Sequence, residues 1–451
     1  MTESSTESST ESEAASEAEK KKPSIARTTL LLLPAHVILR AAEPLLPVFL
    51  AYWFGRSDAT DIYWFAWAVF AFAGSLVFAA YQDSALVPVI AEERLARRSE
   101  LPRFLGSVLA HTWAIGSAIA VLVGLVALGW FAIRYEGPSF VTAAKMVVPF
   151  SLFLIAMCTR TFFATVLTAE RHYFVQPVAT ALGMVVNLAT LALFHDRFGV
   201  AIVPVGALAS EIVASAILAW FVLKIVGVRI ELSFARPPQL VAFAKLIASE
   251  VGGGAVTRIN PVIDQLMAGL SAVVGGGTML RLSGDVASVP TSLLQAALLP
   301  VLLSHLSDDA AKGDLASFKH TVKRSLAWVM GLLVLASFLL YAVRNPLFRL
   351  VFLHGAMDEA GVARMAGLLP YHLVGLPAFG ALLVLARAHV AIKNSRIMVS
   401  MGIINAASNA LFNLVLLKII GLEGLALATS CVYCAVALVF YVRLERRLAR
   451  G

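Results

Sequence analysis

The amino-acid sequence predicts an all-α polytopic membrane protein, with about twelve transmembrane helices in two pseudo-twofold-related lobes of six. The high hydrophobic fraction and the low charged fraction predict this class. Of the 451 residues, 59% are hydrophobic and only 14% are charged, whereas soluble domains are about half apolar and about a quarter charged. A third observation, an internal repeat, predicts the two lobes. The composition excludes an ordinary water-soluble globular protein.

Apolar runs long enough to cross a bilayer recur along the chain, since a transmembrane helix needs about 20 apolar residues. Polar residues, Gly and Pro separate these runs. The predicted spans are 29–54, 62–91, 104–133, 139–168, 173–195, 199–226, 239–270, 276–304, 318–343, 361–390, 396–419 and 421–442. The Ser/Thr/Glu tract 1–22 has no large apolar side chain after Met1, which predicts a disordered cytoplasmic tail.

The distribution of Lys and Arg predicts the orientation, because these residues accumulate in cytoplasmic loops. If the N-terminus is cytoplasmic, the inside segments carry 22 Lys and Arg residues and the outside segments carry 7. This bias predicts that both termini are cytoplasmic and that the number of spans is even.

An internal repeat divides the chain into two halves. Arg40 and Arg258, Asn187 and Asn405, and Gly206 and Gly424 are each separated by 218 positions, and SALVPVI (84–90) matches AALLPVL (296–302). Six spans per repeat preserve the membrane orientation, which predicts a pseudo-twofold axis along the membrane normal. The predicted parts are the tail 1–22, an N-terminal lobe 23–226, a linker 227–238, a C-terminal lobe 239–443 and a basic tail 444–451.

Arginines inside predicted spans are candidate substrate ligands, because charges within a membrane usually face the bundle interior or a wet cavity. Arg40 and Arg258 lie mid-span at matching repeat positions, and guanidinium groups bind phosphate oxygens bidentately. Arg281 is the third candidate for this cationic cavity. The alternative is pairing within the bundle, Arg40 with Glu43 and Arg281 with Asp285; for Arg281 the spacing favours pairing.

Oxygen-bearing side chains in the second half form a candidate cation site. Asp264, Asn405, Asn409 and Thr429 lie within predicted spans, and Asn405 and Asn409 share one helix face. Together they would suit a small cation such as Na⁺. The alternative, which we favour, is hydrogen bonding between helices. No cofactor and no other metal are expected.

Other features argue against catalysis and against nucleic-acid binding. Histidines are scattered, no nucleophile motif accompanies them and no Walker motif is present, so we expect a non-enzyme driven by ion gradients, membrane potential or product removal. The net charge of +8 comes from loops between apolar runs rather than from a solvated basic patch. Arg160 lies near a span end and is expected to extend to the membrane surface.

Several segments resemble one family: ATDIYWFAWAVFAFAGSLVFAAYQDSALVPVIAE (59–92), RINPVIDQLMAGL (258–270), the stretch 289–324 and the stretch 373–430. They are similar, in collinear order, to the MurJ/MviN lipid II flippases of the MOP superfamily of multidrug/oligosaccharidyl-lipid/polysaccharide exporters. The resemblance implies alternating-access transport of an undecaprenyl-diphosphate-linked peptidoglycan precursor to the outer leaflet of a bacterial inner membrane. It also implies a role in cell wall biogenesis. Arg40 matches a functional arginine of that family, and Asp264, Asn405, Asn409 and Thr429 lie near its sodium-site positions.

The chain departs from the family pattern in its arginines and in its number of spans. Gly74 and Ser75 occupy about the places of two arginines in the family's second helix, and about twelve spans replace the fourteen that are frequent there. Two alternatives therefore remain: export of another lipid-linked oligosaccharide or polysaccharide, and a non-transporting membrane scaffold. A wet, positive chamber with lateral access would indicate a flippase, and an acidic chamber would indicate a drug or cation antiporter.

Overall fold

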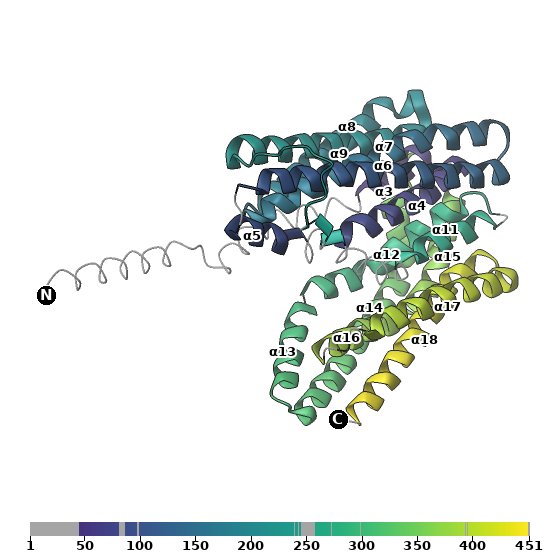
Figure 1. Cartoon of the computed structure of the whole chain (residues 1–451). Helices are drawn as coiled ribbons and strands as arrows, with labels where there is room; N and C mark the ends of the chain where they lie inside the picture. The colour runs from purple at the N-terminus through teal and green to yellow at the C-terminus, as the bar shows by residue number, and fades with distance from the viewer. Residues whose placement is uncertain are drawn as a thin grey trace, which may run out of the picture.

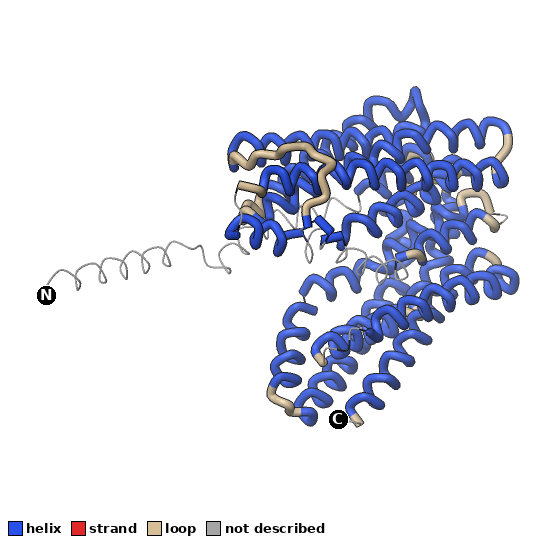
Figure 2. The backbone as a smooth tube through the Cα atoms, in the orientation of Figure 1, coloured by secondary structure: helices blue, strands red, loops and turns tan. Residues whose placement is uncertain are grey.

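The computed structural model describes residues 45–80, 86–96, 99–238, 240–241, 243–244, 258–271, 273–297, 299–392, 394 and 396–449. All regular structure in these ranges is helical (Figure 2), as the composition predicts. The N-terminal tail, most of the first predicted span, about half of the seventh and Arg40 lie outside the described residues.

The first half of the chain forms one group of packed helices. These are α3 (Leu45–Phe54), α4 (Asp58–Ala80), α5 (Val87–Ala96), α6 (Leu101–Arg134), α7 (Gly137–Ala169), α8 (Val175–Phe198) and α9 (Ile202–Trp220). A 3-10 turn (Gly199–Ala201) joins α8 to α9, and a π-helix (Phe221–Val226) continues α9. Figure 1 shows this group as a layer of long, nearly parallel rods. We refer to it as the N lobe.

The second half forms a second group, which we refer to as the C lobe. Its helices are α11 (Asn260–Gly269), α12 (Gly276–Ala297), α13 (Leu299–Ala311), α14 (Leu315–Phe352), α15 (Glu359–Leu373), α16 (Leu376–Ala391), α17 (Arg396–Ile420) and α18 (Leu422–Leu448). Within it, α17 packs along α18, and α14 packs along α15 and α16.

Helix lengths and composition confirm the predicted helical membrane class. In the described part of the chain, six helical runs are long and apolar enough to cross a bilayer, and α15 with α16, bent by 45°, would add a seventh. One of the six runs, Val175–Val226, folds back on itself, because α8 and α9 pack side by side. That run therefore makes two crossings.

Glycines permit the close packing of two helix hairpins. A Cβ on Gly206 of α9 would lie 2.5 Å from Asn187 Oδ1 of α8, and a Cβ on Gly424 of α18 would overlap the Leu416 carbonyl of α17. These two glycines are partners in the sequence repeat. The repeat therefore places a residue without a side chain at the helix contact of each hairpin.

In both halves the repeated motif with a central proline lies where one described helix is followed by another. Pro88 is the second residue of α5 and Pro300 is the second residue of α13. Proline has no amide hydrogen and is tolerated in the first turn of a helix, whereas it disrupts a helix interior. The predicted span 62–91 covers most of α4 and the start of α5, and the predicted span 276–304 covers α12 and the start of α13; residues 81–85 and 298 between these helices lie outside the described residues.

The lobes contact each other at one end of the molecule. Arg56, in the turn between α3 and α4, forms a bidentate ion pair with Asp358, with Nε–Oδ1 at 2.8 Å and Nη2–Oδ2 at 2.9 Å. Asp61 of α4 accepts hydrogen bonds from the backbone N (2.7 Å) and hydroxyl (2.8 Å) of Thr278 in α12. These side chains connect residues that are more than 200 positions apart in sequence.

Hydrogen bonds to backbone carbonyls also join the two lobes at this end. The Ala356 amide donates to the Tyr52 carbonyl at 2.7 Å, and Arg134 Nε donates to the Gly269 carbonyl at 2.7 Å. We call the region around these contacts the closed end. Away from it, α5 and α13 point apart (Figure 1), although α4 lies against α11 and α12. The two lobes are therefore joined at one end and diverge towards the other.

The connection between the lobes is anchored to the N lobe. Residues 228–236 have no regular structure, but the Glu231 amide donates to the Pro102 carbonyl at 3.0 Å. A Cβ on Gly106 of α6 would overlap the Glu231 carbonyl, and the rings of His111 and Phe234 lie 5.8 Å apart. We call residues 228–236 the strap, because they lie along α6.

Candidate functional site

A cavity of about 300 Å³ lies between the lobes. We call it the chamber. Its N-lobe wall is one face of α4, with Trp64, Trp67 and Ala68 at the i, i+3, i+4 spacing that places residues on one side of a helix. Its C-lobe wall comes from α11, α12, α15, α16 and α18, with lining residues that include Asp264, Gln265, Arg281, Asp285, Gln295, His372, Phe379, Thr429 and Tyr433.

Arg281 is the arginine of the predicted set that the structure places in the chamber wall. Its Nε forms an ion pair with Asp285 Oδ2 at 3.0 Å, one helical turn away, as the spacing predicts. Its guanidinium carbon also lies 5.5 Å from the centre of the Trp64 ring, a cation–π contact between the lobes. Because the side chains of Arg281 and Asp285 are 38% and 37% exposed, both remain accessible to a ligand.

Arg258 lies just before α11 and points to the N lobe. Its Nη1 donates to the Ser75 carbonyl of α4 at 2.6 Å, and the side chain is exposed rather than part of the chamber wall. Ser75 is one of the two positions at which the resemblance places an arginine in the family. The guanidinium of Arg258 thus lies near the position where the family resemblance leads us to expect an arginine that this chain lacks.

Asp264 is the centre of a polar cluster between α11 and α17. Its Oδ1 accepts hydrogen bonds from Nδ2 of Asn409 (3.0 Å) and of Asn413 (2.8 Å), and Asn413 Nδ2 also contacts Asn409 Oδ1 at 3.1 Å. Both asparagines are fully buried. The arrangement shows the interhelical hydrogen bonding that the sequence favours, with amide N–H groups directed at the carboxylate. Asn413 was not predicted, although it continues the i, i+4 series of Asn405 and Asn409.

The two other predicted cation ligands, Thr429 and Asn405, take no part in the hydrogen bonds of this cluster. The Thr429 hydroxyl lines the chamber and donates to the Leu425 carbonyl of its own helix at 3.4 Å. Asn405 is half-buried, one turn before Asn409, and takes no part in the hydrogen bonds of the cluster. Among the described residues no group of three or more His, Cys, Asp or Glu side chains is arranged to hold a metal ion.

The charge of the chamber differs from the expected arginine-lined cavity. Its described wall contains one arginine and two carboxylates, and each charge already has a polar partner inside the protein. Four aromatic side chains face the same space: Trp64 and Trp67 from the N lobe, and Phe379 and Tyr433 from the C lobe. Of the two other expected arginines, Arg258 reaches the α4 backbone instead of the chamber wall, and Arg40 lies outside the described residues.

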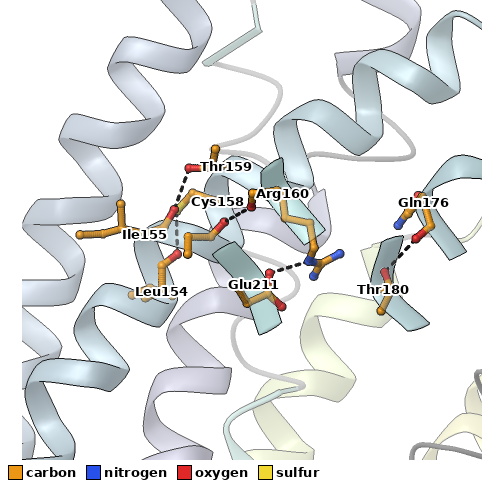
Figure 3. A network of polar contacts seen from close by, with 10 residues as sticks. Leu154, Ile155, Cys158, Thr159, Arg160, Gln176, Thr180 and Glu211 are labelled. Atoms are coloured by element: carbon orange, nitrogen blue, oxygen red, sulfur yellow. Dashed lines mark hydrogen bonds and ion pairs between the residues drawn. The ribbon is translucent and has the colours of Figure 1, made fainter. Parts of the chain in front are cut away.

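A second pair of charges lies inside the N lobe, away from the chamber. Arg160 Nε of α7 and Glu211 Oε2 of α9 are 2.6 Å apart, and their side chains are only 18% and 14% exposed (Figure 3). The predicted extension of Arg160 to the membrane surface is therefore wrong, since a carboxylate on the neighbouring helix lies within reach. This ion pair binds α7 to α9 and takes no part in lining the chamber.

Comparison with known proteins identifies the fold. The solved structure "Lipid II flippase MurJ, inward closed conformation" superposes with a TM-score of 0.77 at 19% identity, and covers 92% of this chain and 87% of that chain. An inward-facing multidrug resistance MATE family transporter of the MOP superfamily superposes with a TM-score of 0.75 at 12% identity, over 90% of this chain and 94% of that one.

Curated relatives are described as probable lipid II flippases MurJ. The protein of Rhizobium meliloti (strain 1021) is 25% identical over 77% of this chain and 66% of its own length. The protein of Haemophilus influenzae is 24% identical over 85% of this chain and 79% of its own length. The chain spans slightly less than two thirds of the Rhizobium meliloti relative, and 41% and 37% of the relatives from Rhizobium tropici and Vibrio cholerae.

The family model "Lipid II flippase MurJ" matches residues 50–450, which include all of the described helices except the first half of α3. The predicted resemblance is thereby confirmed, and the chain belongs to the MurJ lipid II flippase family.

Proposed function

We propose that this chain translocates a lipid II-like precursor, an undecaprenyl-diphosphate-linked glycan, from the inner to the outer leaflet of a bacterial inner membrane by alternating access. One observation carries the proposal: the chamber lies between two lobes that are joined at one end and diverge towards the other. A headgroup can enter such a chamber from the open side only. Release on the other side requires that the lobes separate at the closed end and come together at the opposite end. A scaffold protein has no need of this arrangement.

The closed end is assigned to the periplasm. Arg56, Arg134 and Asp358 lie at turns that the Lys and Arg distribution places outside. The chain also superposes better on the inward-facing MATE transporter, with a TM-score of 0.75, than on the outward-facing one, with a TM-score of 0.61. Both arguments support a state that is open to the cytoplasm, with both termini on that side.

The arginines are assigned to the diphosphate. Arg281 lines the chamber, Arg258 lies at the adjoining surface of α4, and Arg40 is the repeat partner of Arg258. Guanidinium groups keep their charge at any physiological pH and bind two phosphate oxygens at once. A bound diphosphate would compete with Asp285 for Arg281 and with the Ser75 carbonyl for Arg258. Substrate binding would thus loosen one contact between the lobes.

Coupling to Na⁺ is assigned to the Asp264 cluster. The carboxylate and the amide oxygens of Asn405 and Asn409, with Thr429 nearby, are the hard oxygen ligands that such a cation prefers. Rotation of the Asn409 amide by half a turn would exchange its N–H₂ for its oxygen at the carboxylate. The proposal includes no catalytic step and no other cofactor.

Complementation tests the proposal. We expect Arg40→Ala and Arg258→Ala each to abolish rescue of a bacterial strain depleted of its own lipid II flippase, while membrane insertion is retained. The matched control is Arg197→Ala, at the end of α8 and far from the chamber wall. Appearance of labelled precursor in the outer leaflet should follow the same pattern. Full rescue by the Arg40→Ala/Arg258→Ala double variant would refute the assignment.

A second candidate function is the export of another lipid-linked oligosaccharide. The single arginine in the described chamber wall, and Gly74 and Ser75 at the places of family arginines, favour a different headgroup. Labelled precursors with different glycans, supplied to the same vesicles, separate the two candidates. Transport of another glycan in preference to the peptidoglycan precursor would decide for the second.

A further inference from the structure

The aromatic side chains of the chamber are not explained by diphosphate binding. Trp64 and Trp67 on α4 face Phe379 and Tyr433 of the C lobe across a space of about 300 Å³. This volume is at the lower end of the range for ligand pockets, about 300–1,000 Å³, so the chamber contacts one part of a large headgroup. We propose that this part is a sugar ring, which packs on Trp67 and donates its hydroxyl hydrogens to Asp285 and His372. The proposal rests on the proposed function, because it names the moiety that the same chamber recognises.

Trp67 is held in place by the N lobe. Its ring centre lies 5.7 Å from that of Phe153 and 6.3 Å from that of Phe150, both on α7, and the side chain is only partly buried. Tyr63, one turn earlier on α4, is a third ring neighbour at 6.4 Å, and these aromatic contacts fix the orientation of the indole. The rest of the ring is left for the chamber. A pyranose ring has an apolar face of C–H groups, which packs on a fixed aromatic plane.

Trp64 has a different partner. It is almost fully buried, and the Arg281 guanidinium lies against its ring. Its aromatic surface is therefore already used, and it positions the arginine for the diphosphate. Trp67 lies one helical turn further along α4, so a sugar on Trp67 and a phosphate on Arg281 would lie next to each other. This is the order in which the two groups are joined in a lipid-linked glycan.

Two hydrogen-bond acceptors of the chamber have unused capacity. Arg281 Nε binds Oδ2 of Asp285, which leaves Oδ1 outside that ion pair. The Nε2 atom of His372, which lines the chamber, is buried and has no hydrogen-bond partner among the described residues. An unpaired buried acceptor costs free energy that a ligand hydroxyl would recover. Two acceptors beside an aromatic face suit a polyhydroxylated ring, whereas an acyl chain would leave both unsatisfied.

Binding measurements on the full-length protein in nanodiscs test the proposal. The probes are a polyprenyl diphosphate that carries the glycan, the same polyprenyl diphosphate without sugar, and tetraphenylphosphonium as an organic cation. The variants are Trp67→Leu, which removes the aromatic face, and Trp67→Phe, which keeps it. The matched control is Trp130→Leu on α6, a partly buried ring packed 5.9 Å from Phe65 and outside the chamber wall. Thermal unfolding of each variant shows whether it is folded.

We expect Trp67→Leu to weaken binding of the glycan-bearing lipid about tenfold and to leave binding of the sugar-free lipid unchanged. Trp67→Phe should bind both lipids within about threefold of the unmodified chain, and Trp130→Leu should behave in the same way. Equal losses for both lipids, no loss for either, or a loss confined to tetraphenylphosphonium would overturn the sugar assignment alone. If the unmodified chain binds neither lipid, the proposed function fails as well.

Discussion

Asp358→Ala should open the closed end, because this carboxylate binds the C lobe to Arg56 of the N lobe through two hydrogen bonds of 2.8 and 2.9 Å. The side chains of Arg56 and Asp358 are 31% and 51% exposed, and an exposed ion pair contributes about 0.2–1 kcal/mol to the stability of the contact it forms. The bidentate geometry favours the upper end of that range. Close packing also holds the Arg56 side chain in place, because it lies directly against the backbone at Gly275 and Gly361. About 1 kcal/mol corresponds to a roughly fivefold change in the ratio of open to closed molecules.

Distances between spin labels on the exposed residues Glu136 and Ala360 would measure this ratio, since the two positions lie on opposite lobes near the closed end. We expect the population with the longer distance to rise about fivefold in Asp358→Ala. Asp196→Ala serves as the control, because Asp196 lies in the last turn of α8 with a side chain that is 95% exposed. If Asp358→Ala and Asp196→Ala give the same distance distribution, the ion pair contributes nothing to closure and the reasoning is wrong.

The pH dependence of the same measurement has a defined sign. The hydrogen bond from Arg56 holds the pKa of Asp358 below its ordinary value. A carboxylate with a lowered pKa stabilises the closed end fully above the ordinary value of about 4, and this contribution is lost as the pH falls through the lowered value. The closed population should therefore be constant between about pH 8 and pH 5 and should fall only under more acidic conditions. A midpoint near neutrality would contradict this account.

Three further changes test the packing of the lobes. Arg160→Met should lower thermal stability strongly, by about 3 kcal/mol or more, because it leaves Glu211 buried without its partner; the added change Glu211→Leu should restore most of the loss. Gly206→Val should reduce the yield of folded protein, measured by size-exclusion chromatography, at a cost of about 1–3 kcal/mol, because a side chain there overlaps α8. Asn413→Ala removes one of two amide donors to Asp264 and should cost about 1–3 kcal/mol in the same unfolding assay; an unchanged melting temperature would show that water replaces the donor.

The helices could largely be predicted from the sequence, because the length of an apolar run is set locally by the thickness of the bilayer. The predicted spans 104–133 and 139–168 correspond to α6 and α7 within a few residues. The single predicted span 361–390 is instead the bent pair α15 and α16. The bend follows Gly375 and precedes Pro377, a signal that was present in the sequence but was weaker than the apolar run around it.

The candidate site could be predicted only where its contacts are local. The ion pair between Arg281 and Asp285 follows from a spacing of four residues on one helix. The contact of Arg258 with Ser75 joins positions 183 residues apart, and the direction of that side chain depends on how two lobes pack. No periodicity carries this information. The same reason explains why Asp61, which binds Thr278 across the lobes, was not among the predicted residues.

The strap has a mechanical consequence for the whole carrier. The backbone bond between Glu231 and Pro102, and the lack of space above Gly106, fix residues 228–236 to α6, so this part of the connection travels with the N lobe as a rigid body. Leu240 and Phe243, which follow Pro237 and Pro238, are also buried in the hydrophobic core of the N lobe. Any rotation of one lobe against the other must therefore pivot beyond Phe243. Because a lobe that moves as a rigid body is displaced in proportion to the distance from its pivot, a small rotation there becomes a large displacement at the far tips of the helices.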